Sequence, residues 1–317
     1  MNARALLRRW AKPVLRVLLR TPLRRSLESF LLMLGHRFPH RLPGRGVIAE
    51  ELVRLHAGTT VVARLWDGSR QVVPATREAF FHYLHGRAFR EDEGLTRLLA
   101  AEVRAGDVFV DVGANLGYYS LPAARAGARV YAFEAQQALA ELLIRSAALN
   151  GFDERLAVMW AAVSDRPDGF ADFFLAADSS LLGVPSLLPH DWLRGGIVER
   201  VPVVTLDAWA QRNGVTRIDV VKIDVEGAES LVLRGMREVL KQCRPRLVVI
   251  EAWPETISFD SVTPGITHPA QGAARFAECR AMLAACGYTP RGITRDGTLA
   301  PLGVVTGVTN VAFVTNL

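Results

Sequence analysis

The sequence has few cysteines and no long apolar run. The first feature argues against disulfide-rich and zinc-binding proteins, and the second against single-span membrane proteins. Its three cysteines, Cys243, Cys279 and Cys286, form no Cys-x-x-Cys pair. A disulfide framework or a zinc site is therefore not expected, and a reducing compartment fits best. No stretch of about 18 apolar residues occurs, so no single transmembrane helix is expected. Arginines interrupt the N-terminus throughout, which also argues against a secretory signal.

Acidic side chains are missing from the first 25 residues, which carry eight basic ones. A net charge of +6 for the chain and +8 for this segment leave about −2 for the remainder. A near-neutral body offers no basic face to phosphates, so we expect no nucleic-acid partner. On a helical wheel the segment is amphipathic, and Pro13 should kink or split the helix. Such a helix suits an anionic membrane surface; the alternatives are packing on protein and an organellar transit peptide.

Changes in composition and rhythm predict three parts of the chain. These are a basic amphipathic N-terminal arm (1–36), a lead-in subdomain (37–104) and a main domain (105–317). In the lead-in, apolar segments at 60–66 and 71–73 flank Asp67-Gly68, which predicts a tight hairpin. Helical patterns follow at 77–85 and 92–104.

From residue 106 onward, apolar runs alternate with helical patterns. Strands are expected at 108–112, 129–134, 156–163, 218–223 and 247–251, with helices between them. This alternation predicts an α/β fold in which helices cover both faces of a mostly parallel sheet. Segments 170–175 and 201–205 are expected as extra strands around an insert, and 303–315 as a closing hairpin.

The first of these strands ends in a glycine-rich turn, residues 111–117 (DVGANLG). Ligands of open parallel sheets bind beyond the carboxyl ends of the strands, and the glycines allow the backbone to approach one. The second strand ends at Glu134, whose carboxylate can accept hydrogen bonds from both ribose hydroxyls. Ser164 and Asp165 follow the third strand, where we expect an adenine. The turn therefore predicts a nucleoside-like ligand.

The turn departs from the GxGxxG pattern of nicotinamide dinucleotide sites. Asn115 stands at the second glycine position and Tyr118 at the third. A pyrophosphate needs close backbone approach at the second position, so this turn suits a ligand without a diphosphate. An NAD-linked oxidoreductase is the alternative enzyme class. A non-catalytic, membrane-associated binding protein with the same fold is the alternative without activity.

Three segments together resemble the FkbM family of S-adenosylmethionine-dependent methyltransferases. They are residues 111–120 (DVGANLGYYS), 222–229 (KIDVEGAE) and 205–207 (TLD), and the resemblance covers roughly 106–251. It implies a class I methyltransferase fold, Rossmann-like, with a seven-stranded core sheet. It also implies O-methylation, often of sugar hydroxyls in glycans. The chain departs from the family at Ala135, where proline is common, and at Trp253, near which a histidine is frequent.

The resemblance assigns the cofactor residues by position. The glycine-rich loop would comprise Asp111, Gly113, Ala114, Asn115 and Gly117, with Glu134 on the ribose and Ser164 and Asp165 beside the adenine. Asp111 is expected to reach toward the amino-acid part of the cofactor, whose ammonium is cationic. Asp224 and Glu226 would face the methyl donor and the acceptor.

A hydroxyl acceptor has a high pKa and benefits from a base or a metal as its oxygen attacks. Asp224 is the first candidate base, with Glu226 and Glu251 behind it, because all three are expected at the carboxyl ends of strands. Alternatives are that Asp224 only binds the cofactor and that Glu226 caps the next helix. A divalent metal on these carboxylates is an open alternative, not an expectation. His268 as a base and Trp253 as a stacking surface are more distant candidates.

The expected partner is a small-molecule or glycan hydroxyl acceptor, as in polysaccharide biosynthesis. We expect a cytoplasmic protein, with residues 1–25 as a route to peripheral attachment at the inner membrane surface. The sequence specifies neither the acceptor nor an oligomeric state.

Overall fold

The structure is a computed structural model of the chain. It describes residues 45–56, 58–76, 92–175, 185–188, 195–252, 269–305 and 308–315, besides Pro13, Val17, Thr21 and Pro22. Most of the expected arm, the helix expected at 77–85, Trp253 and His268 lie outside the described residues. Contacts divide the chain into two units, 1–92 and 93–317. The boundary expected at 104/105 stays a prediction, and the helix before it packs within the second unit.

The first unit contains the predicted hairpin. Helix α3 (Arg45–His56) precedes strands β1 (Thr60–Arg64) and β2 (Arg70–Pro74), which pair antiparallel. The Asp67 carboxylate accepts hydrogen bonds from the backbone N–H and the hydroxyl of Ser69, at 3.0 and 2.6 Å. These bonds close the turn, because a short acidic side chain substitutes for a backbone acceptor there.

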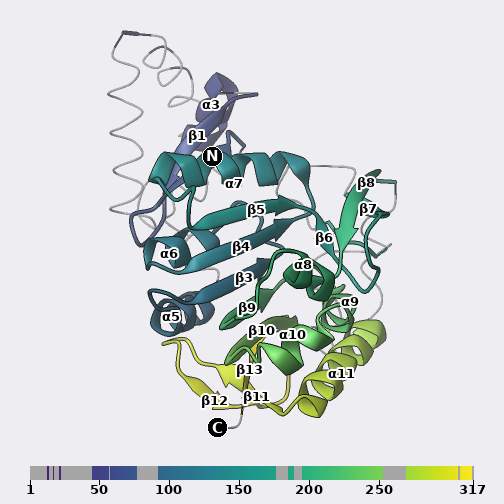
Figure 1. Ribbon diagram of the computed structural model, residues 1–317. Coiled ribbons are helices and arrows are strands. Elements are labelled where there is room, and N and C mark those ends of the chain that lie inside the picture. Colours follow the sequence, from purple (N-terminus) through teal and green to yellow (C-terminus); the bar gives the residue numbers. More distant parts are fainter. Residues whose placement is uncertain are drawn as a thin grey trace. The chain divides into compact units, whose positions relative to one another are not determined.

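The second unit is built on an eight-stranded sheet with the order β12-β11-β13-β10-β9-β3-β4-β5 (Figure 1). The parallel strands are β3 (Val108–Val112), β4 (Arg129–Glu134), β5 (Leu156–Trp160), β9 (Val220–Ile223) and β10 (Leu247–Ala252). Strand β13 (Thr309–Thr315) runs antiparallel between β10 and β11 (Tyr288–Ile293), and β12 (Leu299–Pro301) forms an edge. The predicted α/β architecture is confirmed.

Two details of the predicted sheet are wrong. It has eight strands rather than seven, because the three-residue β12 extends the edge beyond β11. The tail supplies a single central strand, β13, instead of a closing hairpin; the hairpin is formed by β11 and β12. The pairing of β13 with two strands from elsewhere in the chain is a long-range feature that local alternation does not contain.

Helices cover both faces of this sheet. The bounds are α5 (Glu93–Glu102), α6 (Ser120–Arg125), α7 (Gln137–Asn150), α8 (Leu206–Arg212), α9 (Glu229–Arg234), α10 (Arg237–Gln242) and α11 (Pro269–Ala285). Side chains of α8 to α11 join Val110 and Val112 in one apolar core. Alternate residues of β3 face the other side, where Asp111 meets Ser120 of α6. The two faces of β3 thus differ, because Val110 and Val112 pack in this core whereas the other face carries the buried Phe109 and the polar contact of Asp111.

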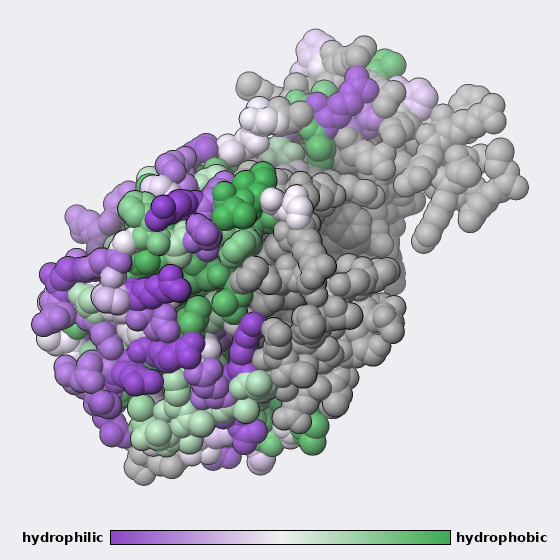
Figure 2. Space-filling model, turned by 90° about the vertical axis from the view of Figure 1, so that its right-hand side faces the viewer, coloured by the Kyte–Doolittle hydropathy of each residue, from purple (hydrophilic) through white to green (hydrophobic). Residues whose placement is uncertain are grey.

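A second, three-stranded sheet has the order β6-β8-β7 and contains the predicted extra strands. Its members are β6 (Ala162–Val163), β7 (Phe170–Leu175) and β8 (Ile197–Val204). The strand expected at 156–163 is therefore divided into β5 and β6. Figure 2 shows apolar surface on this side of the molecule, and Phe170, Ile197 and Val198 of the small sheet are half exposed.

The motif TLD at 205–207 supplies side-chain acceptors to the N-termini of two helices, α8 and α10. The hydroxyl of Thr205 accepts the N–H of Ala208 at 3.1 Å and so caps α8. The carboxylate of Asp207 accepts the N–H groups of Glu238 and Val239, at 3.1 and 2.9 Å, at the start of α10. Side-chain acceptors at helix starts satisfy donors that have no partner within the helix. This motif is explained by folding alone.

Charged side chains tie the amino ends of the strands together. Arg246 Nη2 lies 2.6 Å from Asp107 Oδ2, and Asp219 Oδ2 accepts the N–H of Val108 at 2.8 Å. These residues lie at the amino ends of the strands, whereas the predicted ligand site lies at the carboxyl ends. Within the described part of the chain, no helix combines the length and the apolar character needed to cross a membrane.

Candidate active site

The glycine-rich turn bends over the end of β4. The N–H groups of Gly113 and Ala114 both donate to the carbonyl of Phe133 at 3.0 Å. Gly113 has φ +76° and Asn115 has φ 51°, the left-handed region that glycine and asparagine tolerate best. The Asn115 side chain accepts the N–H of Leu116 at 2.8 Å, which stabilises this conformation. The turn is therefore fixed by its own backbone bonds.

Gly113 and Gly117 leave no room for a side chain. A Cβ atom on Gly113 would lie 1.8 Å from the carbonyl oxygen of Asp224, and one on Gly117 would lie 2.2 Å from Cδ1 of Leu143. The first contact places the loop directly against the residue that follows β9. The predicted loop and the predicted base are thus in backbone contact.

Glu134 fixes the loop through both of its oxygens. Oε2 accepts the N–H of Asn115 at 2.7 Å, and Oε1 accepts the N–H of Gln136 at 2.8 Å. Burial raises the pKa of this carboxyl to about 6, although both N–H groups act in the opposite direction. Each carboxylate oxygen has two lone pairs, so Glu134 keeps acceptor capacity for hydroxyl groups while it holds the loop.

Asp111 is fully buried and has partners within the protein. Its Oδ2 accepts the hydroxyl of Ser120 at 2.6 Å, and its Oδ1 lies 3.5 Å from the ammonium of Lys222. The expected contact of Asp111 with a cofactor ammonium stays a prediction. Ser120 closes the quoted motif, but no role was inferred for it from the sequence.

Lys222 is the main residue at this site that the sequence did not predict. Its Nζ lies 3.2 Å from Asp224 Oδ2 and donates to the carbonyl of Gly113 at 3.2 Å. Burial lowers its pKa, but the nearby Asp224 and Asp111 carboxylates outweigh this and raise the pKa above its ordinary value. A lysine inside the apolar strand VVKI was the available signal, because a buried ammonium needs acidic partners.

The three predicted catalytic carboxylates are brought together. One oxygen each from Asp224, Glu226 and Glu251 lie within 4.8 Å of one another, and all three residues are partly exposed. Burial raises the pKa of Glu226 to about 8, helped by the charges of Asp224 and Glu229. An all-oxygen group of this kind can accept hydrogen bonds from a hydroxyl or bind a hard divalent cation.

The turn that carries Asp224 and Glu226 is anchored from three elements. Glu229 of α9 is buried and accepts the N–H groups of Val225 and Gly227, at 3.2 and 3.1 Å. The hydroxyl of Ser186 donates to the carbonyl of Glu226 at 2.9 Å, and Arg275 of α11 donates to that of Gly227 at 3.4 Å. Burial raises the pKa of Glu229 to about 7.

Ser164 and Asp165 lie beside the end of α9. Asp165 Oδ2 is 3.2 Å from Nε of Arg234, and a Cβ on Gly235 would lie 2.0 Å from the carbonyl oxygen of Ser164. The residue that follows β5 next to Glu134 is Ala161, whose N–H donates to the Glu134 carbonyl at 3.1 Å. Ala161 was missed because the strand was expected to continue to residue 163. The adenine role of Ser164 and Asp165 stays a prediction.

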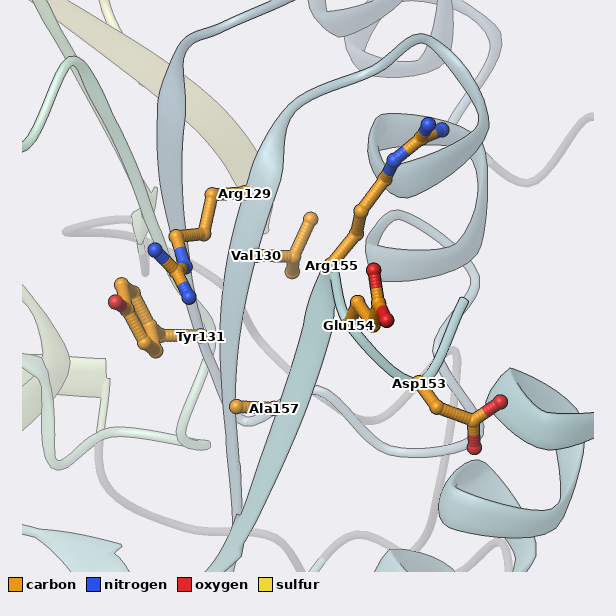
Figure 3. A pocket seen from close by; sticks show the side chains of 7 residues that line it. All are labelled: Arg129, Val130, Tyr131, Asp153, Glu154, Arg155 and Ala157. Atoms are coloured by element: carbon orange, nitrogen blue, oxygen red, sulfur yellow. The ribbon is translucent and has the colours of Figure 1, made fainter. Parts of the chain in front are cut away.

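A separate hollow of about 500 Å³ lies at the amino ends of β4 and β5 (Figure 3). Arg129, Val130 and Tyr131 of β4 line it with the turn that precedes β5. Arg129 is the first residue of β4 and Glu134 is the last, so the hollow lies at the amino ends of the strands and Glu134 at their carboxyl ends. It is no part of the predicted cofactor site.

The residues at the carboxyl edge fit an adenosyl cofactor. Asn115 is exposed at the tip of the loop, and Glu134 beside it retains acceptor capacity for ribose hydroxyls. The close packing of Gly113 on the Asp224 carbonyl sets the carboxylate group directly next to the loop. The glycine-rich loop with Glu134 and the group of three carboxylates are therefore neighbours.

Several of the solved structures that are similar to this chain are methyltransferases. The O-methyltransferase from Bacillus cereus in complex with SAH is 16% identical, covers 71% of this chain and 81% of its own, and has a TM-score of 0.40. A putative O-methyltransferase from Klebsiella pneumoniae is 15% identical, with coverage of 73% and 86% and a TM-score of 0.40. The O-methyltransferase TomG from Streptomyces achromogenes is 18% identical, covers 71% of this chain and 80% of its own, and has a TM-score of 0.38.

No curated protein matches the chain significantly. The family model described as "Methyltransferase FkbM domain" matches residues 111–290, which include the glycine-rich loop, Glu134, Lys222 and the three carboxylates. This match covers more than half of the chain and sets aside the nicotinamide oxidoreductase and the non-catalytic alternative. The chain belongs to the FkbM family of methyltransferases, which use S-adenosylmethionine.

Proposed function

We propose that the protein methylates a hydroxyl group of a sugar, glycan or glycolipid. The observation that carries this proposal is the position of Asp224. Its carbonyl packs on Gly113 of the cofactor loop, and its carboxylate gathers with Glu226 and Glu251. Carboxylates accept hydrogen bonds from hydroxyls, so a group of three beside the methyl donor suits a polyhydroxylated acceptor.

The proposed mechanism asks the protein mainly to position and deprotonate the acceptor. S-adenosylmethionine, when bound, would supply a sulfonium methyl group whose carbon the acceptor oxygen attacks in line, so that the S–C bond breaks and S-adenosylhomocysteine leaves. Glu134 and the 113–117 loop hold the cofactor, and Asp224, with a side chain 34% exposed, takes up the hydroxyl proton. Glu226 and Glu251 orient the acceptor through hydrogen bonds.

The first test is Asp224→Asn with methyl-tritiated S-adenosylmethionine. Mass spectrometry of surface polysaccharides from a deletion strain identifies the unmethylated acceptor to use. We expect the variant to transfer methyl groups about 10²- to 10⁴-fold more slowly, because general-base catalysis typically contributes that factor. Asp153→Asn, at the opposite strand ends, is the matched control.

Equal rates for Asp224→Asn and the wild type would refute the role of Asp224 as the base. Reactions with EDTA separate the base from the divalent-cation alternative, because loss of activity restored by added Mg²⁺ would favour the cation. A deletion strain with unaltered glycans would contradict the proposed acceptor class.

We also propose that residues 1–25 attach this cytoplasmic enzyme to an anionic membrane surface. The support is the sequence, with eight basic residues, no acidic residue and an apolar stripe that includes Trp10. Full-length protein should sediment with vesicles containing phosphatidylserine, and protein lacking residues 1–25 should remain in the supernatant. Equal sedimentation of both would assign the arm to packing on protein instead.

A further inference from the structure

Lys222 contacts both the glycine-rich loop and the carboxylate of Asp224. It lies on β9, two residues before Asp224, and its side chain is 4% exposed. Three oxygens surround its Nζ, namely Asp224 Oδ2 at 3.2 Å, the Gly113 carbonyl at 3.2 Å and Asp111 Oδ1 at 3.5 Å. An ammonium offers three N–H donors, and the number of oxygens matches.

The two shorter contacts of Lys222 are made with groups other than Asp111. Asp111 already accepts the Ser120 hydroxyl at 2.6 Å, and its ion pair with Lys222 is the longest of the three contacts. The contacts at 3.2 Å instead reach a carbonyl of the cofactor loop and the carboxylate of the proposed base. Lys222 therefore bridges two segments that are 109 residues apart in the chain.

The ammonium is also shielded from alternative partners. The ring of Tyr119 lies 5.4 Å from Nζ, which adds a cation–π contact at the start of α6. A buried ammonium cannot exchange these partners for water. The position of Nζ is therefore constrained both by the Asp224 carboxylate and by the Gly113 carbonyl. A shift of the Asp224 carboxylate is therefore transmitted to the Gly113 carbonyl.

We propose that Lys222 is a positioning residue that couples the cofactor loop at Gly113 to the carboxylate of Asp224. Cofactor binding, which fixes the loop, then also fixes the carboxylate that receives the acceptor proton. This inference rests on the proposed function, since it assumes that Asp224 acts on the acceptor. Lys222 itself touches neither cofactor nor acceptor in this role.

Calorimetry with S-adenosylhomocysteine tests the coupling without any acceptor. Wild type, Lys222→Met, Asp224→Asn and the double variant form a double-mutant cycle. We expect Lys222→Met to weaken binding about tenfold, as for loss of a charged hydrogen bond, and Asp224→Asn to weaken it about threefold. In the double variant the loss should equal that of Lys222→Met alone, because the link is already broken.

Controls separate coupling from general damage. Lys241→Met removes an exposed lysine of α10 that pairs with Glu238, and it should bind like the wild type. Lys222→Met leaves the buried Asp111 without a cation and is checked by thermal melting. If it fails to fold, the cycle is repeated with Asp111→Asn/Lys222→Met as the background.

The outcomes are distinguishable. Additive losses, which mean an equal effect of Asp224→Asn in both backgrounds, would overturn the coupling and indicate that Asp224 contacts the cofactor directly. No effect of Asp224→Asn on the wild type would also overturn the coupling while leaving the methyltransferase function intact. Failure of the wild type to bind S-adenosylhomocysteine would overturn the cofactor site and the coupling together.

Discussion

Gly113→Ala is expected to abolish measurable binding of S-adenosylhomocysteine. The new Cβ would lie 1.8 Å from the carbonyl oxygen of Asp224 and 2.9 Å from its carbonyl carbon. Both atoms belong to the backbone, so no side-chain rotation relieves the clash. The residue must also keep φ +76°, which costs an alanine about 1–2 kcal/mol. The loop and residue 224 must therefore separate, which removes the cofactor site.

We expect at least a 100-fold rise in the calorimetric dissociation constant, together with a lower melting temperature. Gly151→Ala is the matched control, because Gly151 has φ +69° but no atom within 4 Å of the added Cβ. It caps α7, so the substitution should cost about 1 kcal/mol of stability and leave cofactor affinity unchanged. Similar losses of affinity in both variants would show that left-handed strain, and not the contact with Asp224, is responsible.

Local periodicity predicts the parallel core of this fold well. Each of the strands β3, β4, β9 and β10 is mostly apolar and mostly buried, as is typical of parallel strands covered on both faces. The break between β5 and β6 was not predictable, because the sequence 156–163 is apolar throughout. The change of partner, from β4 for β5 to β8 for β6, depends on tertiary structure.

The candidate site also contains residues that the sequence predicts and one that it does not. Strand ends predict that Glu134, Asp224, Glu226 and Glu251 share one edge of the sheet, and the structure places them there. The environment of Lys222 is different, because Asp111 of β3 and Gly113 of the loop after it are far from Lys222 in the sequence and no local pattern links them. The sequence therefore predicts the carboxylates at the carboxyl ends of strands, but it does not predict the role of Lys222, which lies inside β9.

Glu134→Gln is expected to weaken binding of S-adenosylhomocysteine by roughly 100-fold, or about 2.7 kcal/mol. The carboxylate accepts two backbone N–H groups with two different oxygens. An amide offers one oxygen and one NH₂ group, so in either orientation the N–H of Asn115 or of Gln136 faces a donor. The loop loses an anchor, and the ribose hydroxyls lose an anionic acceptor.

The pH dependence of binding makes this prediction specific. Because burial raises the pKa of Glu134 to about 6, the wild type loses the ionised acceptor as the pH falls through 6. Affinity should therefore be greatest above pH 7 and decline toward pH 5, whereas Glu134→Gln should bind weakly with no such decline. Glu141→Gln, an exposed carboxyl of α7 that accepts from Gln137, should follow the wild-type curve. A decline in the Glu134→Gln variant that matches the wild type would assign the titration to another group. Wild-type affinity that is flat across this range would mean that the Glu134 carboxylate does not contact the cofactor.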